Sequence, residues 1–242
     1  MNIEALAEKL TSWIRDEITA RGSLGAVLGM SGGVDSSVVA VLCKRAFPEN
    51  TMGVMMPCHS NPDDKAHAQA VADKFDIPTV EVVLDSIYEA FLKKLPEFKD
   101  NPELKHLARA NLKPRLRMVA LYYITNQLRY MVVGSSNRSE VAIGYFTKYG
   151  DGGVDIMPLG NLVKEQVKEL ARFLGIPQPI IDKPPSAGLW DGQTDESEMG
   201  ISYEALDSFI LTGEASDGVR KKIEKMMAGS AHKRSLPPIP EF

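Results

Sequence analysis

The chain has 242 residues, of which 44% are hydrophobic and 25% are charged, so its composition is that of an ordinary globular protein. Its formal net charge of −4 at pH 7 argues against a dedicated nucleic-acid-binding protein, which would be basic. No apolar run is long enough to span a membrane, and the amphipathic first segment does not resemble a signal peptide. Cys43 and Cys58 form neither a disulfide framework nor a metal-binding pattern, so we expect a cytoplasmic protein, with Cys43 in the core.

Short apolar runs alternate with segments of helical periodicity along most of the chain. We expect strands over residues 25–30, 51–56, 79–84 and 130–134. We expect helices over residues 2–20, 34–46, from 61 onward, 104–129, 137–143, 163–174, 202–211 and 216–228. Pro114 is expected to interrupt the longest helix or to start it. This order predicts one α/β domain over residues 1–242, with a Rossmann-like, doubly wound parallel sheet and helices on both faces.

The segment Ser31-Gly-Gly-Val-Asp-Ser36 joins the first expected strand to the next helix. Its two glycines let the backbone approach a ligand closely, and the first N–H groups of a helix carry a charge of roughly +0.5. The loop therefore predicts a site for phosphate, although it lacks the Gly-Lys-Ser/Thr ending of a Walker A motif. A carboxylate beside bound phosphates would repel them without a divalent cation, so Asp35 predicts Mg²⁺. The alternative is a plain glycine-rich turn.

The loop Ser135–Glu140 follows the fourth expected strand. Ligands of open parallel sheets bind outside the carboxyl ends of the strands, so this loop and the Ser31–Ser36 loop should meet in one crevice. Glu140 is then a candidate second ligand for the same cation. The alternative is an acid in the first turn of a helix, where the helix dipole favours negative charge.

Two later features also have two interpretations. The segment 182–200 is rich in proline and glycine, contains an acidic run, and is expected to be a mobile loop; we hypothesise that it covers a bound intermediate as a lid. The segment 118–124 is apolar on most sides of its helix, which fits either a subunit interface or a helix buried within one subunit.

Four motifs in this order and spacing resemble the ammonia-dependent NAD synthetases from about residue 5 to the C-terminus. They are Ser31-Gly-Gly-Val-Asp-Ser36, Asn111-Leu-Lys-Pro-Arg-Leu-Arg-Met118, Phe146-Thr-Lys-Tyr-Gly-Asp-Gly-Gly-Val-Asp155 and His232-Lys-Arg234. The resemblance implies an adenine nucleotide alpha hydrolase-like fold and a homodimer. It also implies a ligase that forms a carbon–nitrogen bond, converting deamido-NAD to NAD with ATP as co-substrate, ammonia and Mg²⁺, through an adenylylated nicotinate with release of AMP and pyrophosphate.

The resemblance also implies roles for particular residues. Asp35 and Glu140 would hold Mg²⁺, and with Lys164 they would be the catalytic residues. ATP would be bound by Gly29, Met30, Ser31, Gly32, Gly33, Val34, Asp35, Ser36, Ser135, Lys164 and Ser186. Deamido-NAD would be bound by Arg115, Lys148, Asp155, His232 and Lys233, with Tyr122 where some members have a flanking aromatic ring. The family often has Thr at positions 135 and 186, and Ala at position 114.

Other functions remain as alternatives. A GMP synthetase-type amination module should lack the segment Phe146–Asp155, and a tRNA sulfur-transfer enzyme usually needs reactive cysteines and a basic face. A non-catalytic nucleotide-binding protein would have little reason to keep both Asp35 and Glu140. We find no glutaminase domain, so free ammonia is the expected nitrogen donor, although a separate glutaminase partner is an alternative.

Overall fold

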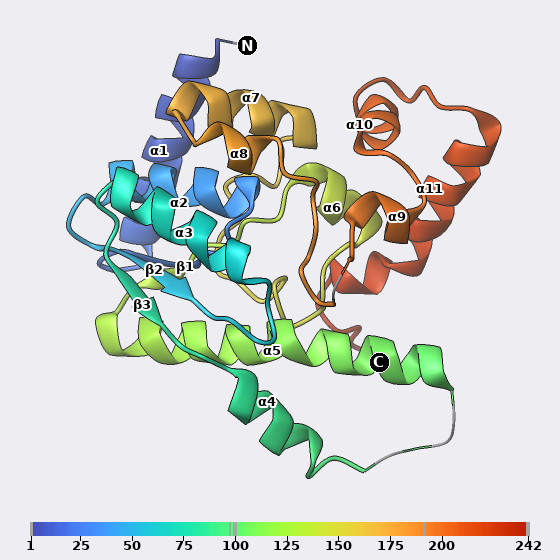
Figure 1. Cartoon of the computed structure of the whole chain (residues 1–242). Helices are drawn as coiled ribbons and strands as arrows, with labels where there is room; N and C mark the ends of the chain where they lie inside the picture. The colour runs from blue at the N-terminus through green and yellow to red at the C-terminus, as the bar shows by residue number, and fades with distance from the viewer. Residues whose placement is uncertain (1, 97, 99–100, 191, 241–242) are drawn as a thin grey trace.

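The computed structural model of the chain describes residues 2–96, 98, 101–190 and 192–240. Its short apolar runs form a four-stranded parallel sheet in the order β3-β2-β1-β4 (Figure 1). The strands are β1 (Ala26–Gly29), β2 (Thr51–Met55), β3 (Thr79–Glu81) and β4 (Met131–Val132). Ala26 of β1 lies opposite Thr51 of β2 and Met131 of β4, which sets the register. The parallel sheet expected from the sequence is therefore confirmed.

Helices cover both faces of the sheet, as expected (Figure 1). Five of them pack on one face: α1 (Ile3–Ala20), α2 (Val34–Ala46), α3 (Pro62–Lys74), α7 (Lys164–Leu174) and α8 (Gln178–Ile181). Two lie on the opposite face: α4 (Asp85–Leu92) and α5 (Pro102–Leu128). Cys43 is fully buried in the first of these two cores, and burial raises the pKa of its thiol.

A third group of helices packs beside the sheet around its own small core. It comprises α6 (Arg138–Ile143), α9 (Asp195–Met199), α10 (Tyr203–Thr212), α11 (Asp217–Gly229) and the short 3₁₀ helix η1 (Ala231–Lys233). Leu206 and Ile223 are fully buried in this core. No helix in the described part of the chain is both long and apolar enough to cross a membrane.

Three details differ from the sequence-based expectation. The strand β3 ends at Glu81 rather than Leu84, and α4 follows it where no helix was expected, because eight residues are too few to show a helical period. The helix α5 continues through Pro114. A proline removes one helical hydrogen bond, but α5 packs along β1 and β4, and this tertiary contact keeps the helix continuous.

The connections determine where a ligand can bind. The chain moves outward from β1 to β2 and β3 and then returns to place β4 on the other side of β1. The strand order reverses between β1 and β4, so the loops that leave these two strands come together at the carboxyl edge of the sheet, where ligands of open parallel sheets bind.

Candidate functional site

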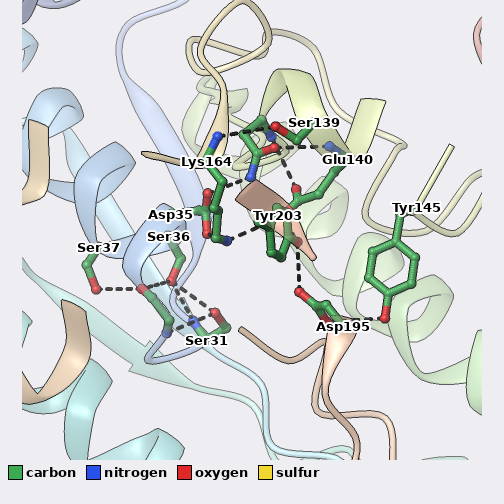
Figure 2. Close-up of polar contacts among 12 residues, drawn as sticks. Ser31, Asp35, Ser36, Ser37, Ser139, Glu140, Tyr145, Lys164, Asp195 and Tyr203 are labelled. Atoms are coloured by element: carbon green, nitrogen blue, oxygen red, sulfur yellow. Dashed lines mark hydrogen bonds and ion pairs between the residues drawn. The ribbon is translucent and has the colours of Figure 1, made fainter. Parts of the chain in front are cut away.

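The loop after β1 is held in shape by its own side chains (Figure 2). Ser31 Oγ lies 3.0 Å from Ser36 Oγ, and Ser36 Oγ donates to the Gly33 carbonyl at 3.0 Å. Gly32 has a φ of 76°. A Cβ at Gly32 would also collide with the main-chain carbonyl of Asp64, so only glycine fits there.

The loop ends at the N-terminus of α2, whose N-cap residue is Gly33. Gly33 offers no side chain to cap the first-turn N–H groups of this helix. These N–H groups lie at the positive end of the helix dipole and can donate to an anion. The loop and the start of α2 therefore offer main-chain N–H groups to an anion.

Three charged side chains meet at one end of this loop (Figure 2). Lys164 Nζ lies 2.5 Å from Asp35 Oδ2 and 3.5 Å from Glu140 Oε1. Lys164 starts α7, Asp35 lies in the first turn of α2, and Glu140 lies in the first turn of α6. The two loops that were expected to converge do meet here.

Asn137 links the two carboxylates. Its Nδ2 donates to Asp35 Oδ1 at 2.9 Å, while its Oδ1 accepts from the Glu140 N–H at 3.0 Å. Glu140 in turn accepts from the Asn137 N–H at 3.2 Å, which completes a capping box. Glu140 is therefore both a first-turn acid and a member of the charged cluster.

Tyr203 and Asp195 close the cluster from the opposite side (Figure 2). The Tyr203 hydroxyl lies 2.9 Å from Asp195 Oδ2 and 3.3 Å from Glu140 Oε1, and Lys164 Nζ lies 5.0 Å from the centre of its ring. Tyr145 donates to Asp195 Oδ1 at 3.2 Å. Asp195 is only 4% exposed. Its carboxylate thus depends on two tyrosine hydroxyls for hydrogen bonds.

The cluster contains more acidic than basic side chains. Burial, together with the charge of Asp35, raises the pKa of the Glu140 carboxyl to about 8. Burial alone would lower the pKa of Lys164, but the carboxylates of Asp35 and Glu140 outweigh it and the pKa is raised. Asp195 adds a third carboxylate, and burial raises its pKa as well. A single ammonium group therefore faces three acids, an arrangement that favours binding of a further cation.

The donor set suits Mg²⁺ shared with phosphate. Among the described residues, no group of three or more His, Cys, Asp or Glu side chains is arranged to hold a metal ion. Mg²⁺ commonly binds to one or two carboxylates and takes its other ligands from phosphates and water. Asp35 and Glu140, next to a phosphate-binding loop, match that pattern.

Two serines, Ser135 and Ser186, were also expected to bind the nucleotide. Ser135 is half-buried just after β4, in the loop that borders the crevice. Ser186 is exposed, and its Oγ accepts from the Gly188 N–H at 3.1 Å.

The residues expected to bind the second substrate form two groups. Arg115 Nε donates to the Lys148 carbonyl at 3.3 Å, and Lys148 Nζ donates to the His232 carbonyl at 2.8 Å. Lys233 Nζ donates to two main-chain carbonyls, those of residues 144 and 146, at 2.7 Å each. Asp155 lies elsewhere, at β4, where it accepts from Tyr122 at 3.0 Å.

Residues 182–190, which belong to the segment 182–200 that was expected to be a mobile loop, contact the rest of the molecule. Lys183 forms an ion pair with Asp64, and the buried Lys113 donates from Nζ to the Leu189 carbonyl at 2.8 Å. The helix α9 follows directly. Asp191, which belongs to the segment expected to be mobile, lies outside the described residues.

Sequence reasoning missed three members of the charged cluster. The spacing of Asn137 and Glu140 is that of a capping box and could have identified Asn137. Asp195 and Tyr203 reach the site from a segment that was interpreted as a loop and from the helix after it. No local pattern marks them.

Comparison with known proteins gives a consistent result. The NAD synthase family model matches residues 6–237. The curated NH(3)-dependent NAD(+) synthetase of Syntrophomonas wolfei is 50% identical over 240 residues, covering 99% of this chain and 96% of that protein. The solved structure of an NMN synthetase from Francisella tularensis is 36% identical in sequence and has a TM-score of 0.95. The solved structure of an NH3-dependent NAD synthetase from Campylobacter jejuni, in complex with nitrate, is 28% identical and has a TM-score of 0.83. Each alignment covers 100% of both chains.

The raised pKa of Glu140 predicts a pH dependence of stability. In the folded, metal-free protein the carboxyl keeps its proton up to about pH 8, whereas its unfolded pKa is near 4.5. The contribution of this carboxyl to the free energy of unfolding is therefore complete below pH 4.5. It falls by about 1.4 kcal/mol per pH unit above that and is lost as the pH rises through 8. Between pH 6 and 8, the free energy of unfolding in EDTA should fall more steeply for the wild type than for Glu140→Gln. Parallel curves from urea titrations would contradict this.

Proposed function

We propose that this chain, which belongs to the NAD synthase family, is a carbon–nitrogen ligase that amidates deamido-NAD to NAD with ATP and free ammonia. The observation that carries the proposal is the position of Lys164 between Asp35 and Glu140, at the end of a phosphate-binding loop. A site that only binds a nucleotide has no need for two half-buried acids beside its phosphates. We further propose that the chain acts as a single cytoplasmic domain; its free, buried cysteines fit a reducing compartment.

The reaction needs activation of the substrate because a carboxylate is a poor electrophile. A nicotinate oxygen attacks the α-phosphorus of ATP, the bond from that phosphorus to the bridging oxygen breaks, and pyrophosphate leaves. Ammonia then attacks the carbonyl carbon of the mixed anhydride and gives up a proton, and AMP leaves with the oxygen. The first step requires alignment and charge stabilisation more than covalent chemistry from the protein.

The residues of this chain supply that alignment. We propose that the N–H groups of the Ser31–Ser36 loop hold the β- and γ-phosphates, where negative charge develops as pyrophosphate departs. Lys164 adds a point charge that the two neighbouring carboxylates keep protonated. Ser135 and Ser186 contribute hydroxyl groups from the loops that border the crevice.

We also propose that Asp35 and Glu140 hold Mg²⁺. When bound, the ion neutralises charge on the phosphate oxygens. Asn137 orients both carboxylates, because its Nδ2 donates to Asp35 Oδ1 at 2.9 Å and its main-chain N–H donates to Glu140 Oε2 at 3.2 Å; Tyr203 contacts Glu140 from the other side. The two acids are therefore fixed in direction by neighbours that carry no charge.

Deamido-NAD is proposed to bind near the contacts among Arg115, Lys148 and His232. Arg115 uses only Nε in its bond to Lys148, which leaves the rest of its guanidinium for a substrate phosphate. Lys233 has three N–H donors and uses two on main-chain carbonyls, so one remains. Asp155 is proposed to contact the substrate at the end of β4, next to Tyr122.

A second candidate substrate is the acid form of the mononucleotide. The NMN synthetase from Francisella tularensis has a TM-score of 0.95 to this chain, compared with 0.83 for the NAD synthetase from Campylobacter jejuni. Both substrates would present the same nicotinate carboxylate to the α-phosphorus. We favour deamido-NAD because the curated relative at 50% identity is an NAD synthetase.

Pyrophosphate release with ATP, Mg²⁺ and ammonia tests the function. We expect kcat/KM for deamido-NAD to exceed that for nicotinate mononucleotide by at least about tenfold, since contacts to an additional adenylate should contribute roughly 1.4 kcal/mol or more. A ratio that favours the mononucleotide would support the second candidate. Absence of pyrophosphate release with both acids would contradict both.

Asp35→Asn tests the proposed catalytic cluster. The substitution removes a charge that pairs with Lys164 and is proposed to bind Mg²⁺, so turnover should fall by roughly 10²–10³-fold. Asp217→Asn, which changes another acid in the first turn of a helix, serves as the control and should keep wild-type turnover. Near-normal turnover of Asp35→Asn would contradict the proposed role of Asp35 in binding Mg²⁺ and in catalysis.

We propose that the chain forms a homodimer through α4 and α5. Several large apolar side chains on these helices and on the segment before them are exposed, among them Val83, Ile87, Phe91, Val119 and Tyr123. Val119 is 58% exposed and Tyr123 is 69% exposed. Adjacent exposed apolar side chains of this size are typical of an interaction surface.

Substitution of Tyr123 tests this interface. Light scattering after gel filtration should give a dimer mass for the wild type and a shift toward the monomer mass for Tyr123→Lys, because a buried unpaired charge is costly. Leu211→Lys is the control, since Leu211 is 54% exposed but lies on α10, away from the proposed interface. A monomeric wild type at micromolar concentration would refute the proposal.

A further inference from the structure

Asp64 contacts both the phosphate-binding loop and the segment 182–190. Its main-chain carbonyl packs against Gly32, where a Cβ would collide with it. On the other side, a Cβ at Gly188 would lie 3.6 Å from Asp64 Oδ2. Asp64 lies in the first turn of α3, which is capped by Asn61 and begins with a proline. A well-defined helix end therefore places this carboxylate at the edge of the loop.

Lys183 brings an ammonium group to the same edge through its ion pair with Asp64. The side chains of Lys183 and Asp64 are 28% and 22% exposed, so the pair is shielded on most sides and open on one. Lys164, in contrast, is 4% exposed and lies at the Asp35 end of the loop. One lysine thus lies at the Asp35 end of the loop, and a second lysine pairs with Asp64, whose main-chain carbonyl packs against Gly32.

This arrangement fits the charge of the molecule that the loop is proposed to bind. A triphosphate lying on the loop would pass between the two lysines. Lysine is a point charge on a flexible stem of four carbons, so Lys183 can turn from the Asp64 carboxylate toward a phosphate oxygen while its backbone stays in place. In phosphoryl transfer, charge on the departing group grows in the transition state, and a cation placed there stabilises it.

We propose that Lys183 is a second cation for the triphosphate and the departing pyrophosphate, and that its ammonium leaves the Asp64 carboxylate to contact them. The inference rests on the proposed function, because it assumes that ATP is cleaved between the α- and β-phosphates. The competing explanation is that the ion pair only fastens the segment 182–190.

The two explanations differ in the effects that they predict for substitutions of Lys183 and of Asp64. If the pair only fastens the segment, Lys183→Gln and Asp64→Asn break the same bond and have the same effect. If Lys183 contacts phosphate, Lys183→Gln loses that contact, whereas Asp64→Asn leaves the ammonium in place. Lys65→Gln is the matched control, since Lys65 lies on the same helix as Asp64 and the substitution breaks its exposed ion pair with Glu81 of β3.

The measurement is the inhibition constant of magnesium pyrophosphate, together with kcat and KM for ATP, for the full-length enzyme. Loss of a hydrogen bond to a charged group predicts that Lys183→Gln weakens pyrophosphate inhibition by about tenfold to a hundredfold, with a lower kcat. Asp64→Asn and Lys65→Gln should stay within about threefold of the wild type, and Lys183→Arg should recover part of the inhibition. Thermal unfolding of each variant checks that it is folded.

Equal weakening by Lys183→Gln and Asp64→Asn, with no further loss in the double variant, would overturn the inference. So would an unchanged inhibition constant in Lys183→Gln. Either result for the variants is compatible with a wild-type enzyme that releases pyrophosphate normally, so the proposed function would stand. A wild type that releases no pyrophosphate from ATP would instead refute the proposed function and this inference together.

Discussion

A buried lysine between two carboxylates determines the arrangement of the crevice. Lys164 joins the start of α7 to Asp35 of α2 and Glu140 of α6, so three helix N-termini are held at one point. Removing one partner from a buried ion pair typically costs about 3–5 kcal/mol, because a charge is left without compensation. The same ammonium lies at the N-terminus of α2, where we propose that the phosphates of a nucleotide bind.

The C-terminal part of the chain completes the site. Tyr203 contacts Glu140 and Lys164, and its hydroxyl donates to Asp195. Lys183 forms an ion pair with Asp64, whose main-chain carbonyl packs against Gly32. The segment that was interpreted as a loop thus supplies both Asp195 and Lys183. A parallel sheet provides only the carboxyl ends of its strands, and the groups that distinguish a ligase from a nucleotide-binding protein come from outside the sheet.

Sequence reasoning reached those parts of the site whose signals are local or follow from topology. The glycines and Asp35 lie within six consecutive residues, and Glu140 follows from the rule that parallel strands end at one edge. Tyr203 and Asp195 carry no such signal, because their contacts join segments more than fifty residues from Glu140 through tertiary packing. Pro114 was overvalued as a helix breaker, since packing on the sheet outweighs the loss of one helical hydrogen bond.

A crystal structure with Mg²⁺ and a non-hydrolysable ATP analogue tests the central claim most directly. The account predicts that the β- and γ-phosphates contact the N–H groups of the Ser31–Ser36 loop and that Mg²⁺ binds to both Asp35 and Glu140. A triphosphate bound elsewhere, with its metal away from both carboxylates, would contradict it.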